Sequence, residues 1–271
     1  YMDDRPIGVF DSGIGGLTAL KAIQDIMPHE NVVYFGDTGR MPYGDKTKET
    51  IISYTYEIAE FLKSFGVKAI LAACGTVSSY LPCVNEEIFG VVKPACVAAV
   101  KTSKNKKIGI LATSAAIKSE SYLNELKKIC DDAEYFSKAC PLLAPMVEHG
   151  NINFENEFLR ETLHEYISPL EKEGVDTLIL GCTHYPILLP VIEKMFENKF
   201  NLIDPGKESA KMLKKYLESN KMSANENQNG FKKFFVSGDE TEFAKSAKLF
   251  LETDILENIK KRDLNKGGDL N

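Results

Sequence analysis

Short, almost continuously apolar runs recur along the chain, separated by longer segments in which apolar and polar residues alternate with a helical period. The apolar runs have the length of single strands, and strands without polar alternation are typical of a parallel sheet that is covered on both faces. We therefore expect strands at residues 6–10, 32–35, 67–73, 108–112, 175–180, 201–203 and 234–236.

The segments between these runs have the periodicity of amphipathic helices. The pattern predicts helices at residues 17–27, 47–65, 119–130, 155–172 and 208–217. Alternation of strands and helices indicates an α/β fold with mostly parallel sheets. The end of the chain, residues 260–271, is charged and contains glycine, and we expect it to form a frayed tail.

The chain contains an internal repeat. Residues 66–76 align without gaps with residues 174–184, and each copy has a helix-ending glycine, a buried strand and a cysteine at the carboxyl end of that strand. Residues 7–12 and 108–113 form a second matching pair, each a strand followed by a small polar residue. Two copies are too few for a solenoid. We therefore predict two pseudo-symmetric, doubly wound α/β domains.

The repeat puts two cysteines, Cys74 and Cys182, in equivalent positions. Open parallel sheets bind ligands outside the carboxyl ends of their strands, so two facing domains would hold one thiol on each side of a shared cleft. A carbon centre between the thiols can lose a proton to one and gain a proton from the other, which inverts it. A thiol is a weak base, with a pKa of about 8.5. His184, Asp11 and Glu148 are the candidates to assist.

Each of these signals also has a structural interpretation. A single cysteine at the end of a buried strand is usually a core residue, and only the matched pair favours chemistry. The run Asp-Ser-Gly-Ile-Gly-Gly at residues 11–16 is either a capped strand-to-helix turn or a cradle for an anion such as a substrate carboxylate. A nucleotide-dependent protein of the sugar-kinase or actin type is a rival, but it leaves the paired cysteines unexplained. We interpret the remaining cysteines as structural: Cys83, Cys96, Cys130 and Cys140.

Composition narrows the functional classes. A net charge of −6 and a pI near 5.4 argue against nucleic acid as a partner. No run approaches the ~18 apolar residues of a membrane span, and the N-terminus lacks a signal pattern, so we expect no membrane partner. The six cysteines are scattered without zinc-type spacing, which favours reduced thiols in the cytoplasm and no metal. No cofactor-binding machinery is evident.

Several stretches together resemble the glutamate racemase family, within the aspartate/glutamate racemase superfamily. The resemblance covers almost the whole chain with the motifs in the right order, which is more specific than any one motif. The matching stretches are residues 10–16, 42–44, 73–76, 145–148, 180–186 and 235–239.

The resemblance implies a cofactor-independent isomerase that converts L-glutamate to D-glutamate for peptidoglycan, and hence for cell shape. Family members are commonly homodimers. It implies a first domain of residues 1–97 with 208–271, a second of residues 98–207, and the active site in the cleft between them. It implies Cys74 and Cys182 as the catalytic acid/bases. It implies assistance or substrate contacts from Asp11, Ser12, Pro42, Tyr43, Gly44, Gly75, Thr76, Glu148, Thr183 and His184.

Two positions depart from the family pattern. Gly75 stands where members usually have Asn, and Ala116 stands where they tend to have Thr. Loss of one hydrogen-bonding partner from a site costs about 1–3 kcal/mol, or roughly ten- to a hundredfold in binding. Two alternatives therefore stand beside glutamate racemisation: a racemase acting on aspartate or a broader range of amino acids, and a binding protein that kept the fold without turnover.

Overall fold

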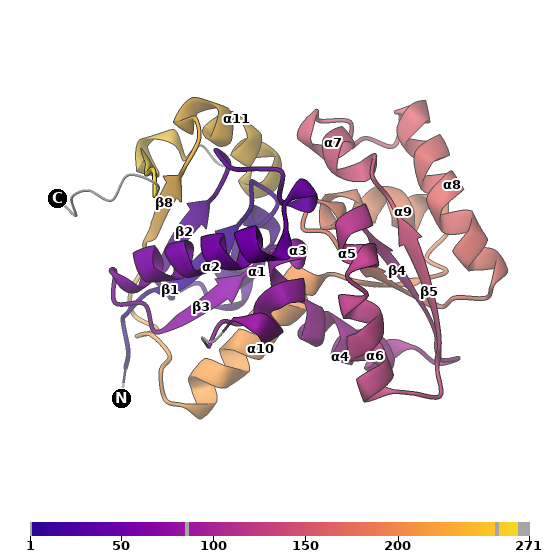
Figure 1. The fold of residues 1–271 in the computed structure, drawn as a ribbon, viewed down its shortest axis with the longest axis horizontal. Coiled ribbons are helices and arrows are strands. Elements are labelled where there is room, and N and C mark those ends of the chain that lie inside the picture. The colour runs from indigo at the N-terminus through magenta and orange to yellow at the C-terminus, as the bar shows by residue number, and fades with distance from the viewer. Residues whose placement is uncertain (1, 85–86, 253–254, 265–271) are drawn as a thin grey trace.

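The computed structural model describes residues 2–84, 87–252 and 255–264, which form two sheets lying side by side (Figure 1). Within these residues, every pair of neighbouring strands in both sheets is parallel. The first sheet has the order β3–β1–β2–β8–β9, with β1 (Ile7–Asp11), β2 (Val32–Gly36), β3 (Ala69–Ala72), β8 (Lys232–Val236) and β9 (Ile259–Lys261). The second has the order β5–β4–β6–β7, with β4 (Lys107–Ala112), β5 (Glu134–Ala139), β6 (Thr177–Leu180) and β7 (Asn201–Ile203).

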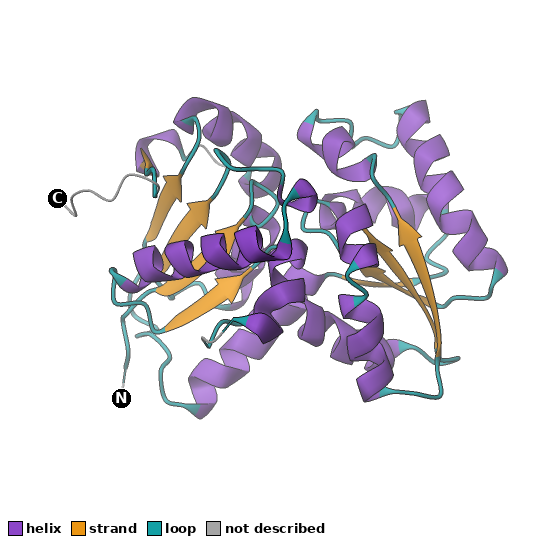
Figure 2. Cartoon of the chain, in the orientation of Figure 1, coloured by secondary structure: helices purple, strands orange, loops and turns teal. Residues whose placement is uncertain are grey.

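Helices cover both sheets, and loops connect them to the strands (Figure 2). The helices expected from the sequence are present as α1 (Leu17–Ile26), α2 (Lys48–Lys63), α6 (Ser121–Ile129), α8 (Glu157–Lys172) and α10 (Pro205–Ser219). The structure adds α3 (Gly75–Tyr80), α4 (Val92–Thr102), α5 (Ser114–Lys118), α7 (Leu143–Glu148), α9 (Leu189–Met195) and α11 (Glu240–Leu251). Short 3₁₀ turns are η1 (Tyr43–Asp45), η2 (Leu81–Cys83), η3 (Tyr185–Leu188) and η4 (Leu256–Asn258).

Successive residues of each central strand pack against different helices. In β1, Ile7 and Val9 belong to the core that contains α1, α10 and α11, whereas Phe10 belongs to the core under α2. In β4, Ile108 and Ile110 pack with α4 and α6, while Leu111 packs with α8. Burial on both faces is why these strands are apolar throughout, and it confirms the predicted doubly wound α/β class.

The sequence repeat is also a structural repeat. The helix-ending residues Gly66 and Gly174 both have left-handed backbones, with φ of +66° and +79°. Gly8 of β1 and Gly109 of β4 occupy matching places: a Cβ on Gly8 would lie 3.2 Å from Leu62, and one on Gly109 would lie 3.2 Å from Leu170. The cysteine-bearing strands β3 and β6 pair with β1 and β4 in the same way. Equivalent elements therefore carry both cysteines.

One expectation for the C-terminal segment is wrong. Lys260 and Lys261 do not fray, because they pair in parallel with β8 as part of β9. Residues 262–264 follow this strand, and the remainder of the expected tail, residues 265–271, lies outside the described residues. The segment from β8 to β9 completes the sheet begun by the N-terminal strands, as the family resemblance implied.

Candidate active site

A cavity of about 180 Å³ opens between the carboxyl ends of the two sheets, and we call it the central cavity. Residues from both halves of the molecule line it, including both repeat cysteines. The lining residues are Ser12, Gly13, Met41, Pro42, Tyr43, Gly44, Cys74, Gly75, Thr76, Thr113, Ala144, Glu148, Gly181, Cys182, Thr183 and His184. Parallel sheets direct their strand ends to one edge, which explains how segments so distant in sequence meet here.

Cys74 lies in the last position before α3, where β3 ends, and only 5% of it is exposed. Its Sγ is 3.4 Å from Oγ of Ser12. Burial raises the pKa of the Cys74 thiol to about 12, the negative charge of Asp11 adds to the rise, and the hydrogen bond with Ser12 opposes it. Cys74 is therefore a neutral thiol at neutral pH and a strong base once it is deprotonated.

Asp11 lies near Cys74 but is not among the residues that line the central cavity. Its Oδ2 accepts hydrogen bonds from the backbone N–H groups of Gly13 and Gly16 at 3.1 and 3.0 Å, which fixes the turn from β1 into α1. Its Oδ1 is buried and has no hydrogen-bond partner among the described residues. Asp11 thus orders the turn and acts on Cys74 through its charge.

Cys182 sits at the equivalent end of β6 beside a histidine. Its Sγ is 3.6 Å from Nδ1 of His184, and Nε2 of His184 is 2.9 Å from Oε1 of Glu148, at the end of α7. The second contact has the distance of an ion pair without the geometry of a regular hydrogen bond. Burial lowers the pKa of His184, but the interactions with Cys182 and Glu148 outweigh it and raise the pKa to about 10. His184 is therefore an imidazolium at neutral pH.

The turn between β1 and α1 contacts the turn after β6 closely. A Cβ on Gly15 would lie 2.2 Å from Oγ1 of Thr183 and 2.6 Å from Nδ1 of His184. Oγ1 of Thr18 donates to the backbone carbonyl of Thr183 at 3.0 Å. The glycines of this turn therefore allow the two halves to approach closely, and they also allow the chain to turn from β1 into α1.

Tyr43 enters the cavity from η1 with its hydroxyl already occupied. The hydroxyl donates to Oδ2 of the buried Asp37, which also accepts from Nε of Arg40 at 2.8 Å. Oγ of Ser237, just after β8, donates to the other oxygen of Asp37 at 2.6 Å. This network fixes the Tyr43 ring as a wall of the cavity. Asp37 was not predicted from the sequence, although it comes directly after the buried strand β2, one residue beyond the register partner of Asp11 in β1.

The two positions that depart from the family pattern differ in their surroundings. Gly75 lines the cavity, and a Cβ there would lie 3.9 Å from the Tyr122 hydroxyl, which is buried without a partner among the described residues. Ala116 is 3% exposed and packs in the core under α4, outside the cavity lining. Thr113 lines the cavity instead, and the repeat could have identified it because it matches Ser12.

The other predicted substrate contacts are among the lining residues: Ser12, Pro42, Tyr43, Gly44, Thr76, Thr183 and His184. Across the described ranges there is no cluster of three His, Cys, Asp or Glu side chains able to hold a metal ion. Nor does any helix within those ranges have the length and apolar character to cross a membrane.

Proteins of one known family are similar to this chain in sequence. Residues 18–213 match the family model described as Asp/Glu/Hydantoin racemase. A glutamate racemase of Persephonella marina is 42% identical over 265 residues, which cover 96% of this chain and 98% of the relative. The chain belongs to the glutamate racemase family.

Solved structures of the family share the whole architecture. Glutamate racemase isoform RacE1 of Bacillus anthracis superposes with a TM-score of 0.88 at 34% identity, covering 96% of this chain and 97% of that one. Glutamate racemase of Francisella tularensis, solved in complex with D-glutamate, gives a TM-score of 0.86 at 33% identity, covering 97% of this chain and 99% of that one. The family fold therefore extends over both sheets and the C-terminal segment.

Proposed function

We propose that this chain racemises glutamate without a cofactor, using Cys74 and Cys182 as the two proton-transfer groups. The observation that carries the proposal is the equivalent placement of these cysteines, each two residues beyond the end of its strand, β3 or β6, with both lining one cavity. A single cysteine there would be unremarkable, but two related by the internal repeat match the need for one acid/base on each face of a planar intermediate.

The proposed step starts with Cys182 as the thiolate and Cys74 as the thiol. The Cys182 sulfur removes the α-proton, and the electron pair of the broken C–H bond stays on the substrate as a carbanion. The Cys74 S–H then delivers its proton to the opposite face, which leaves Cys74 as the thiolate and Cys182 as the thiol. Proton transfer in the reverse sense converts the other enantiomer, so the two half-reactions balance.

The neighbours of the two thiols support this assignment. The imidazolium of His184, held by Glu148, stabilises a Cys182 thiolate at 3.6 Å. On the other side of the cavity, burial and the charge of Asp11 raise the pKa of Cys74. The Cys74 thiolate is therefore a base strong enough to remove the α-proton in the reverse reaction. The two thiols thus have different surroundings, because Cys74 is buried beside Asp11 and Cys182 lies beside the cation of His184.

Apart from the imidazolium of His184, the donors available to a dicarboxylate substrate are neutral. The lining residues carry the hydroxyls of Ser12, Thr76, Thr113 and Thr183, and those that the structure describes include no lysine or arginine. Hydroxyls and backbone N–H groups at strand ends suit carboxylates. Glutamate is favoured over aspartate because the relatives at about 40% identity over nearly the full chain are named glutamate racemases. The alternative is a racemase that accepts a broader range of amino-acid substrates, because Gly75 departs from the family pattern.

The experiment compares the initial racemisation rates of both enantiomers of glutamate and aspartate. Circular dichroism monitors each reaction, with no cofactor added. Pockets discriminate one methylene by about 1–3 kcal/mol, so we expect kcat/KM for glutamate to exceed that for aspartate by at least roughly tenfold. Faster turnover of aspartate would replace the substrate assignment and keep the mechanism. Binding of glutamate without any turnover would favour a non-catalytic binding protein.

Four further properties belong to the same proposal and rest on the family resemblance. D-Glutamate made by the chain would supply peptidoglycan synthesis. The enzyme would act in the cytoplasm, and it would be a homodimer. The domains would be residues 1–97 with 208–271 and residues 98–207. These boundaries fall inside α4 and α10, two helices that pack against each other, so the connections between the domains would run through this helix pair.

A further inference from the structure

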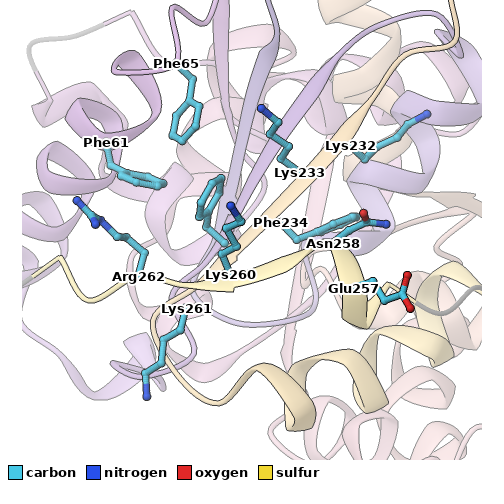
Figure 3. A pocket seen from close by; sticks show the side chains of 11 residues that line it. Phe61, Phe65, Lys232, Lys233, Phe234, Glu257, Asn258, Lys260, Lys261 and Arg262 are labelled. Atoms are coloured by element: carbon cyan, nitrogen blue, oxygen red, sulfur yellow. The ribbon is translucent and has the colours of Figure 1, made fainter. Parts of the chain in front are cut away.

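A second and larger cavity lies far from the chemistry described above, on the face of the first sheet next to α2. Its volume is about 560 Å³, and we call it the outer pocket. Phe61 comes from the C-terminal part of α2 and Phe65 from the segment just after it, and four of the other lining side chains come from β8, from β9 and from the residue after β9 (Figure 3). These are Lys233, Phe235, Lys260 and Arg262.

Strand geometry explains why these side chains share one face. Phe235 of β8 is the register partner of Lys260 in β9, and side chains two apart along a strand point to the same side. Lys233 therefore lies on the side of Phe235, and the backbone N–H of Arg262 continues the ladder by donating to Val236 at 2.7 Å. α2 ends at Lys63 and packs against β1 and β2, whereas β8 and β9 lie beyond β2 in the strand order.

The floor of the outer pocket is aromatic. The Phe235 ring centroid lies 5.1 Å from that of Phe61 and 5.1 Å from that of Phe65. Phe61 is buried, whereas Phe65 and Phe235 are partly exposed. Ring faces left open in a surface site are suited to stacking against another flat ring, as the aromatic platforms of base-binding proteins show.

The rim of the outer pocket is cationic in an acidic protein. The chain has 39 acidic and 33 basic side chains, yet five of the basic ones line this pocket, with Glu257 as the carboxylate among its described lining residues. Lys233 and Lys260 are both exposed, and neither forms an ion pair within the described part of the chain. The pocket therefore attracts anions.

Protection of the sheet edge accounts for only part of this arrangement. Lysines on an edge strand discourage pairing with other chains, and this explains the lysines of β9. It does not explain Lys233, which lies on the inner neighbour β8, or the open rings of Phe65 and Phe235 beneath the lysines. An aromatic floor with cations at its rim matches a ligand that joins an aromatic ring to a phosphate group.

We propose that the outer pocket binds a nucleoside di- or triphosphate. The base lies against Phe65 and Phe235, and the phosphates lie between the ammonium groups of Lys233 and Lys260. The volume is within the range of about 300–1,000 Å³ typical of small-molecule sites. The proposal is independent of the racemase chemistry, because no residue of the central cavity takes part.

The test is isothermal titration of the full chain with ADP, beside adenosine and inorganic pyrophosphate, at low ionic strength. We expect ADP to bind at least roughly tenfold more tightly than either fragment. Stacking contributes about 1–3 kcal/mol per base, so Phe65→Leu should weaken ADP binding by roughly five- to a hundredfold and leave pyrophosphate binding unchanged. The double variant Lys233→Ala/Lys260→Ala should weaken ADP and pyrophosphate binding alike.

The matched control is Lys118→Ala/Lys127→Ala, which removes two exposed lysines from the other half of the molecule and should leave ADP binding unchanged. Far-UV circular dichroism and thermal unfolding establish that each variant is folded. Three results overturn the proposal: no ADP binding by the parent chain, equal affinity for ADP and pyrophosphate, or ADP binding that survives the Lys233→Ala/Lys260→Ala change.

Discussion

The two thiols of the central cavity have different surroundings although the repeat makes them equivalent. Cys74 is buried beside Asp11 and Ser12, and its pKa is raised to about 12. Cys182 is partly exposed and contacts the charged His184. In the proposed mechanism, a symmetric carbon inversion would thus be served by two thiols with different surroundings.

Replacement of either cysteine tests the pair directly. Cys74→Ser and Cys182→Ser should each lower racemisation by roughly 10²–10⁴-fold in both directions, because a positioned acid/base contributes about that much. Each variant should still exchange the α-proton of the one enantiomer that faces its remaining thiol. Polarimetry follows the first effect and proton NMR in deuterated water the second. A Cys182→Ser enzyme that racemises at the parental rate would refute the two-base assignment.

The ion pair of His184 with Glu148 predicts a pH effect. Contacts with Cys182 and Glu148 raise the pKa of His184 to about 10, and Glu148→Gln removes one of these two groups, so the pKa should fall by roughly 1–3 units. Because the imidazolium is lost as pH rises, the alkaline limb of kcat/KM should move to lower pH by a similar amount. NMR titration of the histidine and pH–rate profiles measure both shifts. Glu161→Gln, an exposed position on α8, is the control that should leave both unchanged.

The raised pKa of His184 also has a consequence for stability. A folded-state pKa of about 10 against an ordinary value of 6.5 means that the proton stabilises the fold. This contribution is complete below pH 6.5 and is lost as pH rises to 10. A Glu148→Gln variant whose alkaline unfolding and activity profile both matched the parent would show that the carboxylate does not act on His184.

Most of the residues that the proposed mechanism uses could be predicted from the sequence, whereas Asp37, which holds the hydroxyl of Tyr43, could not. Cys74, Cys182, His184 and Glu148 come from motifs that stand out in the sequence. Asp37 was missed because its role depends on where Tyr43 and Ser237 lie in space, which no local pattern encodes.

At the scale of elements, the turn from β1 to α1 joins the two halves at the site. Its glycines leave room for Thr183 and His184, and Thr18 in the first turn of α1 bonds to the loop after β6. A side chain at Gly15 would overlap atoms of the other half, whereas one at Gly13 would reach only Sδ of Met41 at 3.5 Å, an ordinary contact.

Gly15→Ala should therefore lower kcat/KM by at least roughly a hundredfold, because it displaces His184 from Cys182, and misplacement by about 1 Å costs that much. Gly13→Ala, in the same turn, should cause a much smaller loss. Steady-state kinetics with thermal unfolding as a check on folding separates the two. Equal losses in both variants would show that the turn is generally sensitive and that the contact with His184 is not the cause.

The limits of prediction at this scale follow from burial. β1, β2, β4 and β6 are covered on both faces and stand out as apolar runs. β5 is a sheet edge with no fully buried residue, and β9 has two exposed lysines in three residues, so neither has the expected pattern. α10 begins earlier than predicted because Asp204 caps it through the N–H groups of Gly206 and Lys207.

At the scale of the whole molecule, segments distant in sequence are tied together beneath the first sheet. The buried ammonium of Lys68 forms an ion pair with Glu30 at 2.6 Å and donates to the backbone carbonyls of Asp3 and Met222 at 2.6 and 2.7 Å. The N-terminal segment, the loop between α1 and β2, the residue before β3 and the segment after α10 meet at this one group.

Lys68→Met should therefore destabilise the protein strongly, because it leaves the buried Glu30 without its cation. Breaking a buried pair costs about 3–5 kcal/mol, which corresponds to a fall in Tm of roughly 6–20 °C for a chain of this size. The double variant Lys68→Met/Glu30→Met removes both charges and should recover part of the loss. Calorimetry measures both, and a double variant no more stable than the single would contradict the explanation by charge.

The most direct test of the central claim follows the α-hydrogen of L-glutamate in deuterated water by proton NMR during early turnover. Two opposed thiols predict that newly formed D-glutamate carries deuterium, because its proton comes from a thiol that has exchanged with solvent. The remaining L-glutamate should still carry protium. D-Glutamate that retains the original proton would mean that one group serves both faces, and it would contradict the assignment of Cys74 and Cys182 as separate acid and base.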